Sequence, residues 1–195
     1  MPSGRTHDSI TLWSLPLIAG LSLVCTQDGS LALVTSGGFL FSGLMFGPDL
    51  DIHSKQYRRW GWLRWIWLPY RRSLRHRSFW SHGFLVGTIV RLLYLFSWFL
   101  LLIAGVIVLG AFIAYGQGQS AQWYTLVQQQ LSLTGQRIRQ VCTTYPIHAT
   151  ALVVGLELGA MSHSMSDWLG STYKRLRNAD RKKYRPSSSH DSRDS

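Results

Sequence analysis

The chain has 195 residues, enough for one domain with a substantial core, and carries a formal net charge of +11 although only 15% of its residues are charged. This apolar and strongly basic composition excludes an ordinary soluble domain and indicates either a nucleic-acid-binding protein or a membrane protein with a basic cytoplasmic face. The two cysteines form no CxxC pair, which argues against a disulfide framework or a thiolate zinc site.

Four apolar segments predict an all-α protein. The polar N-terminus MPSGRTHDSIT precedes the first of them, and no small-residue cleavage pattern follows that segment, so we expect no cleavable signal peptide. Leu12–Cys25 and Leu31–Gly47 are short and glycine-rich, and the turn-like TQDGS separates them. Each is marginal for crossing a membrane alone and is equally compatible with a buried or partly inserted helix.

The third apolar segment, Leu92–Tyr115, is the clearest membrane span in the sequence. Its 24 residues carry no charge, and as a helix it would be about 36 Å long, enough to cross a hydrocarbon core of about 30 Å. Its length and its apolar character on every side favour a membrane helix over a helix in a soluble core. The fourth segment, Ile147–Met161, is again marginal and contains Glu157, the only glutamate. Glu157 is either a support for a polar site, a buried general base, or a packed side chain.

The basic residues are unevenly distributed along the chain. Eight lie between Lys55 and Arg77 and seven between Lys174 and Arg185, whereas Gly116–Gln136, expected to be a loop, has none. The positive-inside rule places both clusters, and the C-terminus, on the cytoplasmic side of the cell membrane and this loop on the opposite side. We therefore expect a membrane-associated bundle of about four main helices in residues 1–172, followed by a basic, disordered tail at 173–195.

Histidine and aspartate side chains gather just before or just after the apolar segments. If the segments form two helical hairpins, these side chains all come to the same, cytoplasmic end. The group consists of His7, Asp8, Asp49, Asp51, His53, His76, His82, His163 and Asp167. Imidazole and carboxylate ligands suit Zn²⁺, Mn²⁺ or Fe²⁺. The sequence therefore predicts a site at this end of the bundle for one or two divalent ions, with zinc as the first expectation.

Residue spacing supports part of this prediction. His163 and Asp167 are four residues apart and so share one face of a helix. Pro48 is expected to end the preceding helix, which places Asp49 on a turn. Taken alone, each motif is more often a surface pair, a turn or a cap, and His76 among arginines is equally a solvated or phosphate-facing residue. Only the joint occurrence of the motifs indicates a metal site.

Four motifs, SGRTHDSIT, PDLDIHSKQYRRWG, HRSFWSHG and LGAMSHSMSDW, together resemble a bacterial family of metal-binding proteins. That family is similar to membrane-bound metal-dependent hydrolases, which share the order PDLD…HR…(S/T)H…SH…D. More remotely, an early histidine, a mid-chain aspartate and a later HxxxD resemble zinc-dependent phospholipase C and the fungal single-strand nucleases. Those relatives are all-helical enzymes that cleave phosphoesters with a cluster of zinc ions.

The resemblance implies ligand roles for individual residues. The positions that match are His7, Asp49, His82, His163 and Asp167, with His53 and Asp51 as further ligands or as partners of ligands. His76 and Arg77 match the HR of the hydrolases. The chain lacks the additional ligands that phospholipase C carries after HxxxD, so one or two ions are expected rather than three.

These observations predict a membrane-associated metal-dependent hydrolase that acts on phosphoesters of a phospholipid or a nucleotide. An aspartate that is not a ligand, Asp51 or Asp8, would accept the proton of the attacking water. The anionic substrate would be held by Arg71, Arg72, Arg75, His76 and Arg77. The alternative is a non-catalytic protein whose metal staples marginal helices, or is sensed or carried. Nucleic-acid binding is not expected, because no recognised motif is present and the topology accounts for the arginines.

Overall fold

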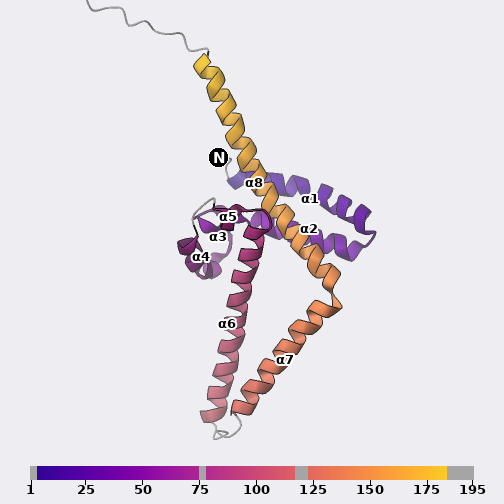
Figure 1. Cartoon of the computed structure of the whole chain (residues 1–195), viewed down its shortest axis with the longest axis vertical. Helices are drawn as coiled ribbons and strands as arrows, with labels where there is room; N and C mark the ends of the chain where they lie inside the picture. Colours follow the sequence, from indigo (N-terminus) through magenta and orange to yellow (C-terminus); the bar gives the residue numbers. More distant parts are fainter. Residues whose placement is uncertain (1–3, 75–77, 117–122, 184–195) are drawn as a thin grey trace, which may run out of the picture.

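The computed structural model describes residues 4–74, 78–116 and 123–183, and every regular element in these ranges is helical (Figure 1). The predicted all-α class is therefore confirmed. In chain order the elements are α1 (Gly4–Thr26), α2 (Gly29–Leu44), η1 (Pro48–Asp51), α3 (Lys55–Arg59), η2 (Gly61–Trp67), α4 (Leu68–Ser73), α5 (Phe79–His82), α6 (Val86–Gly116), α7 (Trp123–Thr144) and α8 (Pro146–Lys183). The segments η1 and η2 are 3₁₀ helices.

The first two helices form a hairpin whose turn lies within TQDGS, as the sequence predicts. Asp28 caps α2, because its Oδ1 accepts hydrogen bonds from the backbone N–H groups of Ser30 at 2.7 Å and Leu31 at 3.3 Å. The hairpin returns the chain to the level of its N-terminus, where Pro48 begins η1. The start of α1 and the residues after α2 therefore lie at the same end of the hairpin.

Helix α6 contains the whole of the predicted span at 92–115 and extends away from α1, α2 and α8, while its far end lies beside the start of α7 (Figure 1). None of its most apolar 18-residue window is buried in the described structure. Three helical stretches of the described residues are long and apolar enough to cross a membrane, namely Gly4–Thr26, Gly29–Asp51 and Val86–Gly116. An apolar helix that no protein covers is stable in lipid rather than in water, so the fold is compatible with membrane association.

Two predicted boundaries differ from the structure. The expected loop at 116–136 ends early, because α7 begins at Trp123; its glutamines and leucines favour helix over loop. Residues 173–183, assigned to the basic tail, continue α8 as helix, since Lys, Arg, Leu and Ala are good helix formers. The expected domain boundary at 172 thus falls inside α8, and the remainder of the tail, 184–195, lies outside the described residues.

Helices α2 and α8 pack with their backbones in contact. A Cβ atom at Gly155 would lie 2.2 Å from the carbonyl oxygen of Thr35, and one at Gly159 would lie 2.5 Å from the carbonyl oxygen of Phe39. Only glycine permits so close an approach, in the manner of the GxxxG contacts of membrane helices. Positions 155, 159, 163 and 167 follow one another at intervals of four and so form one ridge that winds slowly around α8. This ridge contacts α2 at its glycines and carries His163 and Asp167 toward the start of α1.

A small aromatic core holds the segment between α2 and α6. Trp67 is completely buried, and its ring packs against those of Phe46, Trp60, Tyr70 and Tyr94 with centroids 5.1–5.8 Å apart. Leu50 of η1 is part of the same buried cluster. Burial of these large rings fixes η1, and with it the two aspartates of PDLD, beneath α8.

We expect Gly155→Ala to destabilise the protein by about 1–3 kcal/mol, because the added methyl group must displace the backbone of α2. Gly37→Ala is the matched control, since a Cβ there meets nothing within 4 Å, and alanine favours a helix by about 0.5–1 kcal/mol over glycine. Thermal unfolding in detergent, followed by circular dichroism, should show a lower Tm for the first variant only. Equal Tm values for both variants would contradict this account of the α2–α8 contact.

Candidate metal centre

His7, His163 and Asp167 form one buried group at the junction of α1 and α8. One ligand atom from each lies within 4.8 Å of the others. The two imidazole rings stack with their centroids 3.9 Å apart, and Nε2 of His7 is 3.2 Å from Oδ1 of Asp167. His7 and His163 are 7% and 4% exposed, so water does not solvate these polar atoms freely. The predicted convergence of early and late motifs is therefore present in the fold.

Ser166 contacts the nitrogen of His7 that points away from Asp167. Its hydroxyl lies 2.8 Å from the carbonyl oxygen of His163, to which it donates, and 2.7 Å from Nδ1 of His7. Either group can donate in the second contact, depending on the tautomer of His7. With a cation on Nε2, Nδ1 would carry the proton and donate to Ser166. Nε2 of His7 lies 3.2 Å from the Asp167 carboxylate.

This arrangement fits a divalent cation. Among the described residues, Oδ1 of Asp167 and both ring nitrogens of His163 are buried without a hydrogen bond. A cation shared by these atoms would satisfy them by coordination. The ligand atoms of a tetrahedral ion with bonds of about 2.1 Å stand about 3.4 Å apart, close to the 3.2 Å spacing of His7 and Asp167.

Asp49 supplies a fourth group from a third element. It follows Pro48 in η1, and its Oδ2 lies 3.2 Å from Nε2 of His163. The set of two imidazoles and two carboxylates, from α1, η1 and α8, is typical of Zn²⁺, Mn²⁺ and Fe²⁺ sites. No sulfur ligand contributes, because Cys25 and Cys142 are exposed and far from this group in sequence.

Comparison with known families decides the affiliation of the chain. Residues 2–177 match the family described as "Uncharacterized metal-binding protein (DUF2227)". The chain belongs to this metal-binding family. An uncharacterized protein of Aquifex aeolicus (strain VF5) is 41% identical over 59 residues, which is 30% of this chain and 41% of that protein's length. The chain thus spans about two fifths of this relative. No solved structure matches the chain.

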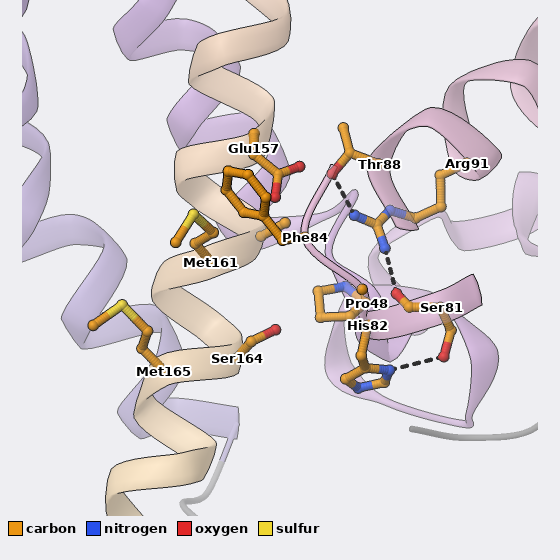
Figure 2. Close-up of a pocket in the computed structure, with 12 residues that line it drawn as sticks. Pro48, Ser81, His82, Phe84, Thr88, Arg91, Glu157, Met161, Ser164 and Met165 are labelled. Carbon is orange, nitrogen blue, oxygen red and sulfur yellow. Dashed lines mark hydrogen bonds between the residues drawn. The ribbon is translucent and has the colours of Figure 1, made fainter. Parts of the chain in front are cut away.

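The matched region includes every member of the candidate centre and a neighbouring pair. Asp51, also in η1, is 5% exposed, and its Oδ2 lies 3.7 Å from Nδ1 of His82. The same nitrogen lies 2.8 Å from Oγ of Ser81 (Figure 2). His82, a predicted ligand, therefore lies beside Asp51 and is not part of the group formed by His7, His163 and Asp167. His53, a predicted ligand, is exposed and lies beside the ring of Tyr57, outside that group.

Asp8 is engaged in a different interaction. Its carboxylate accepts two hydrogen bonds from Arg59, both at 2.8 Å, and one from Lys55 at 2.7 Å. A bidentate arginine contact of this kind orients both partners. Asp8 thus joins the start of α1 to α3. Because His7 is the preceding residue, this contact also helps to fix the position of His7.

The predicted substrate-binding residues are only partly described. Arg72 is exposed on α4, and Arg71 stacks over Tyr57, whereas Arg75, His76 and Arg77 lie outside the described residues. Two functional candidates escaped the sequence analysis, Ser166 and the buried Arg91. Ser166 carried no signal of its own, since the SHSMSD motif contains several serines. Arg91 carried one, as the only charge within an otherwise apolar helix.

We expect purified protein to contain a divalent ion and His163→Ala to lose it, since this ring touches both Asp49 and His7. Ser166→Ala should weaken metal affinity by about 10–100-fold, because His7 then loses the partner that orients its ring. His148→Ala and Ser162→Ala are the matched controls on α8. Elemental analysis and competition with a chelating dye measure both effects. Full metal content in His163→Ala would exclude this site.

Proposed function

We propose that the protein is a membrane-associated, metal-dependent hydrolase of phosphoesters. The observation that carries the proposal is the buried group of His7, His163 and Asp167, whose ligand atoms lie within 4.8 Å of one another in a family of metal-binding proteins. His7, His163, Asp167 and Asp49 would hold the ion, with zinc as the first candidate and manganese or iron as the others. When bound, such an ion activates water and polarises a phosphoryl oxygen.

The proton acceptor is assigned to Asp51. Its carboxylate is buried beside His82, and it lies two residues from Asp49 in the same short helix, η1. Asp8, the other candidate, is less suited, because Lys55 and Arg59 already engage both of its oxygens. His82 would orient Asp51 and receive the proton in turn.

The anionic substrate is a phospholipid headgroup or a nucleotide phosphate, held by the basic cluster that includes Arg72, Arg75, His76 and Arg77. We place the protein in the cell membrane with the metal site and the C-terminus toward the cytoplasm. Positive-inside distribution of Lys and Arg supports this orientation. Exposed Trp80, shortly before the start of α6, suits the headgroup region. Trp62 and Trp65 are also exposed and line a groove along α6 with Leu95.

Asp51→Asn should lower phosphoesterase turnover by about 10²–10⁴-fold, as expected for loss of a general base. Metal content should remain unchanged, because Asp51 is not assigned as a ligand. Asp28→Asn, an exposed carboxylate at the tip of the α1–α2 hairpin, is the matched control. Turnover is measured in detergent or in vesicles on phosphomonoester and phosphodiester substrates, and wild-type turnover in Asp51→Asn would refute the assignment.

In the second candidate function, the bound ion holds the helices together and the protein catalyses no reaction. The ligands come from both α1 and α8, so a bound ion would join these two helices. Only 6% of the most apolar window of α1 is buried, so the rest of the described chain covers little of this helix. In this case metal removal lowers Tm in detergent and no phosphoester is turned over. Turnover that depends on Asp51 distinguishes the hydrolase from this alternative.

The proposed orientation predicts the behaviour of reporter fusions. A reporter inserted near Gln119 should be active on the side opposite the cytoplasm, because α6 would have crossed the membrane before it. A reporter after Ser195 should be active on the cytoplasmic side, because α7 and α8 would bring the chain back. Paired alkaline phosphatase and fluorescent protein fusions measure this in cells. Both reporters on the same side would mean that the chain does not cross the membrane between 119 and 195.

A further inference from the structure

A cavity of about 140 Å³ lies between α8 and the segment that connects α5 to α6. It adjoins the metal centre without sharing its ligands, since Pro48, the neighbour of Asp49, and His82 both line it (Figure 2). A water-sized group needs about 10–15 Å³ by the same kind of measure, so the cavity has room for a ligand of several heavy atoms.

Arg91 places a positive charge in the wall of this cavity. It is 1% exposed, and its guanidinium donates to the carbonyl oxygen of Ser81 at 3.0 Å and to Oγ1 of Thr88 at 2.9 Å. Both acceptors are neutral. Tyr70 also approaches the guanidinium and is neutral as well, because burial raises the pKa of its phenol. The carboxylates of Glu157 and Asp51 attract the guanidinium from a distance, but among the described residues neither forms an ion pair with it within 4.0 Å. Since a buried charge is costly unless it is paired, the cavity suits an anion.

Glu157, on the wall formed by α8, requires a hydrogen-bond donor from a ligand in the cavity, whereas Arg91 requires a negative charge. Glu157 is 6% exposed, and its Oε1 accepts a hydrogen bond from the backbone N–H of Leu85 at 3.0 Å. Its Oε2 is buried without a hydrogen-bond partner among the described residues. Figure 2 shows this side chain directed from α8 toward the segment that carries Thr88 and Arg91. A ligand that satisfies Oε2 must offer a hydrogen-bond donor.

We propose that this cavity binds hydrogen phosphate, with Arg91 contacting its negative oxygens and Glu157 accepting its O–H proton. Inorganic phosphate retains a proton at neutral pH, whereas sulfate has none and would set an acceptor against Glu157. Ser164, which lines the cavity from α8, adds a hydroxyl on the side facing His82 (Figure 2). If the protein is the hydrolase proposed above, a site for free phosphate would hold a product of its reaction. Hydrolysis of a phosphomonoester releases free phosphate, whereas hydrolysis of a phosphodiester does not. The inference, which rests on the proposed function, therefore narrows the substrate class to phosphomonoesters.

The test measures anion binding by calorimetry on the full-length, metal-free protein in detergent. Inorganic phosphate should bind, and sulfate should bind at least about tenfold more weakly, because Oε2 of Glu157 would lose its donor. In Glu157→Gln the amide can donate to either anion, so the two affinities should become similar. Asp28→Asn, the control carboxylate, should keep the wild-type preference. Equal affinities for phosphate and sulfate in the wild-type protein would overturn the proposal.

A cavity-filling variant tests the location without removing a buried charge. Ser164→Leu should abolish phosphate binding while the circular dichroism spectrum and Tm stay near those of wild type. Ser171→Leu, two turns further along α8, should bind phosphate normally. Unchanged phosphate binding in Ser164→Leu would place the anion elsewhere and overturn the proposal. Phosphate binding is measured without metal, so the two proposals can fail separately. Absence of phosphate binding would overturn the cavity proposal alone, and absence of metal-dependent turnover would overturn the hydrolase proposal alone.

Discussion

The backbone contact between α2 and α8 is the interaction on which the candidate site depends. Gly155 and Gly159 let the two helices approach until their main-chain atoms touch. With larger residues the axes would separate, and His163 and Asp167, further along the same face, would move away from the start of α1. In lipid, packing of this kind takes the place of a hydrophobic driving force between helices. The positions of the polar His163 and Asp167 side chains thus depend on an apolar contact between two helices.

A second support acts from the opposite direction. The aromatic cluster around Trp67 buries Leu50 and so places the aspartates on either side of it, Asp49 and Asp51, beneath α8. One carboxylate meets His163 and the other meets His82. The two aspartates of the PDLD motif therefore serve different neighbours, Asp49 the ion-binding group and Asp51 the histidine in the cavity wall. A short 3₁₀ turn suits this division, because residues two apart in it point to different sides.

Sequence reasoning reached the helical class, the long apolar helix, the α1–α2 turn and the convergence of His7 with His163 and Asp167. These features follow from local pattern, namely apolar length, turn residues and four-residue spacing. The pairing of Asp8 with Arg59, the role of Ser166 and the burial of Arg91 depend on tertiary contacts that no local pattern encodes. Helix α7 was missed because its uncharged glutamines, serines and glycine suggest a loop, although its apolar residues recur with helical spacing.

The first half of α6 is tied to the rest of the described chain at several levels. Arg91 donates to Ser81 and lines the cavity, and Tyr94 and Trp98 pack against the rings of Trp67 and Trp65. The most apolar 18-residue window of the helix nevertheless contains no buried residue. One helix therefore joins two environments, a polar wall at its beginning and an apolar surface over the rest of its length. Substitutions among its exposed apolar residues should alter that surface and leave the cavity wall intact.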